Sequence, residues 1–172
     1  MKKIFFISVI CLVLFSCGKD KKAASVKIVA KSDFVVHLDA IYQKNDSTFL
    51  DLYDNNGNGI MAKRVFTNVK ASPVVQRVTY KIPVDTDFTN ICFSLSTNKE
   101  QKDIQIKGVT ILNKEKTIIG APGDHWDYYF ANNDQLEMNV KTGIHKLKHE
   151  KEYCAGLAGN DLLKSLFKKE KE

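Results

Sequence analysis

The chain has 172 residues, with 26 Lys or Arg against 20 Asp or Glu, which gives a formal charge of +6 at neutral pH. This length suits one folded domain around a single hydrophobic core. The basic excess is small and the lysines are spread along the sequence, which argues against nucleic acid as a partner.

Residues 1–16 have the composition of a secretory signal. Lys2 and Lys3 form a positive start, and the run from Ile4 to Phe15 is almost entirely apolar. That run is too short to span a membrane comfortably, whereas it matches the apolar region of a signal peptide. We therefore expect this segment to direct export and then to be removed.

Leu14-Phe15-Ser16-Cys17 ends the apolar run, and its Leu14, Ser16 and Cys17 resemble the lipobox of bacterial lipoproteins. The resemblance implies that Cys17 becomes the first residue and carries acyl chains such as palmitate. Two or more chains hold a protein stably on a bilayer, which would place this one in the cell envelope, at the outer membrane, facing the periplasm or the surface. The alternative is an ordinary signal or an uncleaved anchor in which Cys17 has no role.

Residues 17–25 predict a lipidated, flexible tether, because GKDKKAAS is charged and small and lacks apolar periodicity. From residue 26 to residue 150, short segments rich in Val, Ile, Phe, Tyr and Thr alternate with Asn, Asp, Gly and Lys clusters, as strands and turns do. We predict strands at Val26–Ala30, Phe34–Gln43, Thr48–Tyr53, Ile60–Phe66, Val74–Ile82, Thr89–Ser96, Ile104–Leu112, Thr117–Gly120, Tyr128–Ala131, Leu136–Val140 and Ile144–Leu147.

The fold class that these strands predict is all-β, an antiparallel two-layer β-sandwich of jelly-roll type. Ile91, Phe93 and Leu95 alternate onto one face, and Gly108 interrupts the next strand as a β-bulge would. No helical segments separate the strands, so a parallel α/β sheet is not expected. Residues 151–172 predict a helical tail with an amphipathic helix, capped by Asn160 or Asp161.

The segment from Gly123 to Asp134 combines aromatic rings with carboxylates, amides and an imidazole, as sugar-binding sites do. The ligand-binding candidates are Asp124, His125, Trp126, Asp127 and Tyr129. In the alternative interpretation, Tyr128 and Phe130 fill the core, and Trp126 covers one end of the sandwich.

Three further groups have a structural and a functional interpretation. Asp54, Asn56 and Asn58, followed by Gly59, resemble the first half of an EF-hand calcium loop, but Asn-Gly pairs between strands favour a hairpin turn. Cys92 and Cys154 would remain after export and could form a disulfide or lie buried as two thiols. His145 and His149 lie four residues apart in an alternating segment, which predicts an exposed edge strand rather than a metal site, and His37 beside Asp39 predicts a polar outer-face pair.

No G-x-S-x-G, HExxH or P-loop motif is present, so we predict no catalytic residue and no cofactor. Four stretches, listed here in chain order, resemble strands of the β-sandwich modules in bacterial envelope glycan proteins, which are similar to carbohydrate-binding jelly rolls: Val75–Pro83, Phe88–Asn98, Ile104–Ile111 and Tyr129–Asn133. The resemblance implies a non-catalytic glycan-binding or accessory module. The alternatives are an interaction subunit of an envelope membrane-protein complex and an envelope polysaccharide hydrolase.

Overall fold

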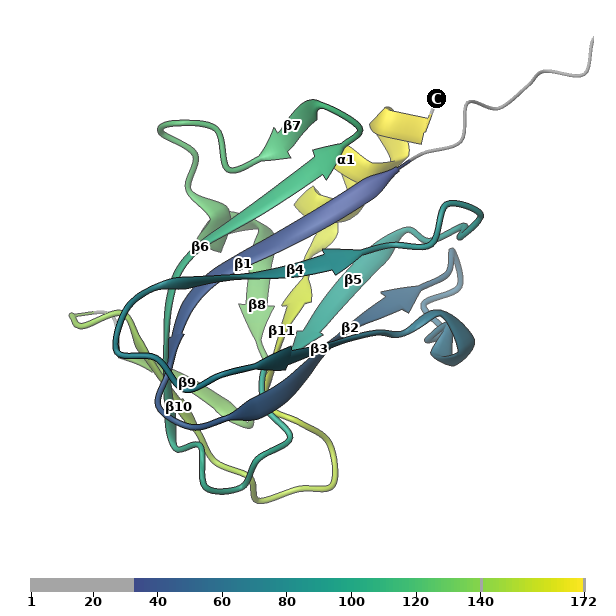
Figure 1. Ribbon diagram of the computed structural model, residues 1–172. Helices are drawn as coiled ribbons and strands as arrows, with labels where there is room; N and C mark the ends of the chain where they lie inside the picture. The colour runs from purple at the N-terminus through teal and green to yellow at the C-terminus, as the bar shows by residue number, and fades with distance from the viewer. Residues whose placement is uncertain (1–32, 140, 172) are drawn as a thin grey trace, which may run out of the picture.

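The computed structural model describes residues 33–139 and 141–171, which form two antiparallel sheets packed face to face (Figure 1). The first sheet has the order β4-β1-β6-β10-β9, with β7 paired to β6. Its strands are β1 (Phe34–Tyr42), β4 (Gln76–Lys81), β6 (Asp103–Asn113), β7 (Lys116–Ile119), β9 (Leu136–Asn139) and β10 (Ile144–Leu147).

The second sheet has the order β3-β2-β5-β11-β8. Its strands are β2 (Asp46–Tyr53), β3 (Val65–Val69), β5 (Asn90–Ser94), β8 (Phe130–Asn132) and β11 (Gly156–Gly159). The chain crosses repeatedly from one sheet to the other, so strands that follow one another in sequence often lie in opposite layers. The predicted all-β, two-layer sandwich is confirmed.

The core lies between the sheets because the strands alternate apolar and polar side chains. In β1 every second residue from Phe34 to Tyr42 is buried, and in β5 the buried residues include Ile91 and Phe93. The predicted bulge is present, since the register between β1 and β6 shifts at Asp39, opposite Gly108. The shift keeps the apolar residues on both sides of it facing inward.

The helix α1 (Asp161–Lys171) closes one end of the sandwich. Its buried residues are Leu163 and Phe167, and the Phe167 ring packs edge-on against Phe34 and Phe88, with ring centroids 5.5 and 5.1 Å away. Leu162, in contrast, is 58% exposed. The helix is therefore part of the domain core rather than a separate tail.

The largest correction concerns the expected tail, residues 151–172, because it contains a strand. β11 lies between β5 and β8 in the second sheet, so the sandwich extends beyond residue 150. Its sequence, Gly-Leu-Ala-Gly, has low strand propensity. Only close packing explains the glycines: a Cβ on Gly156 would lie 2.5 Å from the Phe93 carbonyl oxygen, and one on Gly159 would lie 2.2 Å from the Asn90 side-chain oxygen.

Other element boundaries differ locally from the expectation. The segment Ile60–Phe66 forms the 3-10 helix η1 (Met61–Lys63) followed by the start of β3, and the strand expected at Tyr128 is preceded by the 3-10 helix η2 (Trp126–Tyr129). The expected strand at Val26–Ala30 lies outside the described residues, as do the signal segment, Cys17 and the tether.

Candidate binding surface

The loop from β7 to β8 begins with a turn that Asp124 holds. One carboxylate oxygen of Asp124 accepts hydrogen bonds from the backbone N–H groups of Gly120 and Ala121, each at 3.0 Å. Gly120 has φ of +96°, and a Cβ there would meet the backbone of Thr110 at 2.9 Å, so the turn requires glycine. The Asp124 carboxylate is engaged in shaping the loop, which makes it a supporting residue rather than a free ligand contact.

Trp126 lies partly buried at the start of η2. Its ring centroid is 6.4 Å from that of Phe130, and it packs against the hydrophobic core together with Tyr129. Trp126 and Tyr129, both candidates from the sequence, thus attach the loop to the core through their packing. This agrees with the alternative in which Trp126 covers one end of the sandwich.

Tyr128 is the solvent-exposed aromatic residue of η2, with 64% of its surface accessible. Its centroid lies 5.2 Å from that of His125, at an interplanar angle of 36°, and the neighbouring Asp127 is exposed as well. These three residues, His125, Asp127 and Tyr128, are called the aromatic platform below. Two of them were predicted, and the platform is the surface of this loop that a ligand can reach.

Sequence reasoning missed Tyr128 because strand alternation from residue 128 onward places Tyr128 and Phe130 on the same inward face. The 3-10 turn breaks that alternation, with the Tyr128 N–H bonded to the His125 carbonyl at 3.1 Å. The Gly-rich stretch before Trp126 was the available signal that a turn continues into this segment.

Asn160 fixes the platform to the rest of the fold. Its side-chain NH₂ donates to the Tyr128 carbonyl oxygen at 2.7 Å, and its backbone N–H donates to the Tyr129 carbonyl at 3.0 Å. The side-chain oxygen of Asn160 accepts the N–H of Leu162 at 3.0 Å, which caps α1. The loop is therefore anchored through one residue to a helix whose Phe167 is buried.

The Asp54 segment is a turn. The Asp54 carboxylate accepts the N–H groups of Asn56 and Asn58, each at 2.8 Å, and Gly57 adopts φ of +79°. These hydrogen bonds, foremost the one from the Asn58 N–H, lower the pKa of Asp54. The Asp54 carboxylate oxygen, a candidate calcium ligand, thus already accepts hydrogen bonds from the backbone, as the hairpin alternative predicts.

The two cysteines are free thiols. Cys92 points to the outer side of β5, in register with Asp51 of β2, and burial, followed by the nearby Asp51 carboxylate, raises its pKa to about 12. Burial also raises the pKa of Cys154. Neither thiol has the low pKa of a reactive nucleophile.

The histidines do not form a metal site. His145 lies on β10, which is flanked by β6 and β9, and it is 1% exposed, so the expected exposed edge strand is wrong for this residue. His149 follows the strand with φ of +52° and bonds the Gln101 carbonyl at 2.7 Å. On the outer face of β1, His37 bonds the Thr79 hydroxyl at 3.0 Å while Asp39 pairs with Arg77, so these two residues form no dyad.

Within residues 33–139 and 141–171, no three His, Cys, Asp or Glu side chains lie close enough to share a metal ion. The same residues include no helix with the length and hydropathy that crossing a membrane requires.

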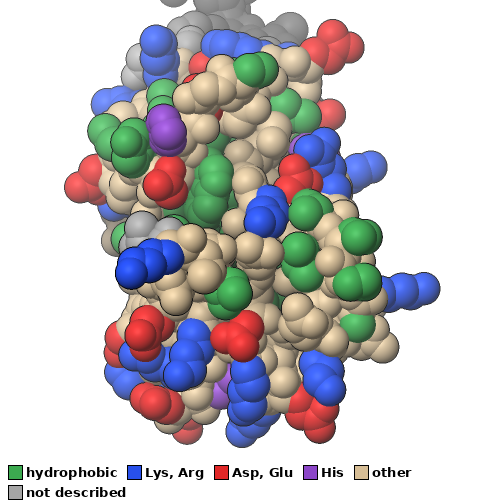
Figure 2. Space-filling model, turned by 90° about the vertical axis from the view of Figure 1, so that its left-hand side faces the viewer, with side chains coloured by type: hydrophobic (Ala, Val, Ile, Leu, Met, Phe, Trp, Pro, Cys, Tyr) green, Lys and Arg blue, Asp and Glu red, His purple; other side chains and the backbone are tan. Residues whose placement is uncertain are grey.

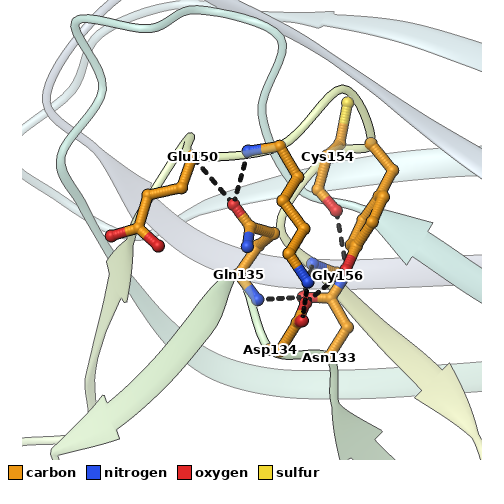
Figure 3. Close-up of polar contacts among 8 residues, drawn as sticks. Asn133, Asp134, Gln135, Glu150, Cys154 and Gly156 are labelled. Atoms are coloured by element: carbon orange, nitrogen blue, oxygen red, sulfur yellow. Dashed lines mark hydrogen bonds and ion pairs between the residues drawn. The ribbon is translucent and has the colours of Figure 1, made fainter.

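A polar network at the opposite end of the sandwich joins the β8–β9 turn to the segment before β11 (Figure 3). The Asn133 side chain donates to the Cys154 carbonyl at 2.8 Å and accepts the Gly156 N–H at 3.1 Å. The Gln135 side-chain oxygen accepts the N–H of Glu150 at 2.8 Å. Because the Asn133 amide and the Gln135 oxygen bond backbone groups on both sides, the network positions the segment before β11.

Comparison of the chain with protein-family models, with curated proteins and with solved structures finds no match.

Proposed function

We propose that this protein is a lipid-anchored β-sandwich of the bacterial cell envelope that binds a glycan through the aromatic platform and performs no chemistry on it. The observation that carries the binding role is Tyr128, a ring 64% exposed on a turn that Asn160 ties to the core. The lipobox resemblance at Cys17, a residue outside the described range, supports the location.

The platform has the chemistry that sugar recognition needs. A phenol ring stacks on the apolar face of a pyranose, and the Asp127 carboxylate and the His125 imidazole offer hydrogen-bond partners to its hydroxyl groups. Because Asn160 holds the Tyr128 backbone, little conformational entropy is lost when a sugar covers the ring.

The direct test is a glycan array followed by calorimetric titration of the best-binding oligosaccharide. We expect Tyr128→Ala to weaken binding at least tenfold with an unchanged melting temperature. Tyr153→Ala is the matched control, because Tyr153 is a 49% exposed ring at the opposite end of the domain. A protein that binds no glycan, or one that loses equal affinity in both variants, would contradict the proposal.

Trp126 supplies an independent readout because it is the only tryptophan in the chain. Its partly buried ring lies in the same short helix as Tyr128, so glycan binding should quench or shift its emission. Trp126→Ala should weaken binding and also lower the free energy of unfolding, since the ring packs on the core. An emission spectrum that no glycan changes, although the array detects binding, would place the ligand elsewhere.

A further inference from the structure

The charge of this protein is uneven along its sequence. Between Asn55 and Val84 the chain has five basic residues and no acidic one. The five are Lys63, Arg64, Lys70, Arg77 and Lys81. The expectation that the lysines are simply dispersed does not hold for this stretch.

The same stretch folds into one continuous side of the sandwich. It forms η1, β3 and β4, and β3 and β4 are edge strands of different sheets that lie next to each other (Figure 1). The Thr67 hydroxyl donates to the Thr79 carbonyl at 3.2 Å, and the Gln76 side chain donates to the Lys70 carbonyl at 2.8 Å. β3 and β4 therefore meet along one edge of the sandwich. Phe66 is in register with Phe49 on the outer face of the second sheet, whereas Lys81 shares the outer face of the first sheet with Arg77. The part of this edge from η1 through β3 to the turn at Val75 is called the β3–β4 side below.

Large hydrophobic side chains are exposed to solvent on this side. Four of the ten exposed large hydrophobic residues of the described chain come from it: Met61 at 63%, Phe66 at 66%, Val74 at 67% and Val75 at 48%. Figure 2 shows the end of this side near the β3–β4 turn on its right, where hydrophobic side chains lie beside Lys and Arg. Clustered exposed hydrophobics of this kind mark interaction surfaces.

Two of the five cations are neutralised and three are not. Arg64 pairs with Asp51 at 2.6 Å, and Arg77 pairs with Asp39 at 2.7 Å. Among the described residues, the ammonium groups of Lys63, Lys70 and Lys81 form no ion pair. The β3–β4 side thus carries a positive field around its apolar residues.

Phe66 is held in place before any partner arrives. The Arg64 guanidinium lies 4.0 Å from the Phe49 ring centroid and 5.9 Å from that of Phe66, and the two rings are 5.4 Å apart. The ion pair with Asp51 fixes the guanidinium in turn. A rigid aromatic ring beside Arg and Met has the composition of a protein–protein hot spot.

We propose that the β3–β4 side docks an acidic protein surface, with Phe66 and Met61 as its apolar anchors and Lys63 and Lys70 as its charge complement. A second copy of this chain does not fit, because an isologous contact would place these lysines opposite one another. This role is independent of glycan binding at the aromatic platform.

The test places a photo-crosslinking amino acid at position 66, at position 74 and, as a control, at position 162, where Leu162 on α1 is also exposed. Crosslinking is carried out in the cells that make the protein, and the product is identified by mass spectrometry. We expect positions 66 and 74, but not 162, to capture the same protein. That protein, once purified, should bind the full chain, with affinity lowered at least tenfold by Phe66→Ala and by the double change Lys63→Glu and Lys70→Glu.

The charge variant should also remove most of the salt dependence of the association rate. Three results would overturn the proposal: no shared adduct at positions 66 and 74, a captured protein whose affinity the charge variant leaves unchanged, or a crosslink between two copies of this chain. Vesicles of phosphatidylglycerol and phosphatidylcholine test the remaining case, in which this surface binds a membrane. Vesicle binding that Phe66→Ala abolishes, without a protein adduct, would assign the surface to a membrane instead.

Discussion

The side-chain amide of Asn160 donates to the carbonyl oxygen of Tyr128 over 2.7 Å, while its oxygen caps α1. One residue therefore couples the exposed Tyr128 of the aromatic platform to the C-terminal helix.

Asn160→Ala should remove both the hydrogen bond to Tyr128 and the cap of α1. Loss of the cap costs about 1 kcal/mol of unfolding free energy, and glycan affinity should fall as well. Asn160→Asp is the matched control, because a carboxylate still caps the helix but cannot donate to Tyr128. Urea unfolding and calorimetric titration together should show that Asp restores stability and not affinity. Equal affinity in the Asp variant and the wild type would show that the bond to Tyr128 does not matter for binding.

Gly156→Ala should destabilise the sandwich, because the new Cβ would lie 2.5 Å from the Phe93 carbonyl oxygen in the middle of the second sheet. Overpacking of this kind costs about 1–3 kcal/mol. Gly108→Ala is the control, since its Cβ would have no neighbour nearer than 4.0 Å. Thermal unfolding of the two variants measures the difference, and equal melting temperatures would contradict the close packing of β11.

His145 should make stability depend on pH. The ring is 1% exposed, neither of its nitrogens makes a hydrogen bond of good geometry, and burial lowers its pKa below 6.5, although a weaker contact with the Gly143 backbone opposes the shift. Between that lowered value and 6.5 the unfolded chain binds more protons than the folded one, so stability is complete above about pH 6.5 and falls as the pH decreases. A single titrating group changes the free energy of unfolding by at most about 1.4 kcal/mol per pH unit.

Urea unfolding from pH 7.5 to 5 should therefore show a smaller loss of stability in His145→Leu than in the wild type. At pH 7.5 the Leu variant should be at least as stable, because it removes two unpaired buried nitrogens. His37→Gln is the control: the pKa of His37 is also lowered, but the ring is less buried and bonds Thr79. Parallel pH profiles of the wild type and His145→Leu would rule out His145 as the source.

Cys92 and Cys154 should both be alkylated by iodoacetamide after denaturation without reductant, because the structure holds them as free thiols. In the native protein Cys92 should react much more slowly than a free cysteine, since its pKa of about 12 leaves almost no thiolate at pH 8. Intact-mass analysis gives the number of labels. An unlabelled denatured protein would instead establish the disulfide.

Cys17→Ala should abolish palmitate incorporation and release the protein from membranes, because two or more acyl chains provide the anchoring energy. Metabolic labelling followed by membrane fractionation measures both effects, with Cys92→Ala as the control. Unchanged labelling of the Cys17 variant would contradict the lipoprotein hypothesis.

Alternation in the sequence predicted most of the sandwich, because burial of one strand face dictates a period of two residues. β1, β2, β6 and β10 match their expected ranges closely, and the Gly108 bulge was visible as a break in the alternation. The same reasoning failed for β11, whose glycines weaken any local strand signal and make sense only against the carbonyl of Phe93.

At the candidate site the sequence located the loop, since Gly and Pro residues introduce a segment rich in aromatic and acidic side chains. Which ring faces solvent depended on the 3-10 turn of η2 and on Asn160, some thirty residues further along the chain. The β3–β4 side, likewise, joins edge strands of two sheets. Local patterning alone determined strands, turns and composition, whereas contacts between distant residues decided which side chains are open, because exposure depends on what the rest of the chain covers.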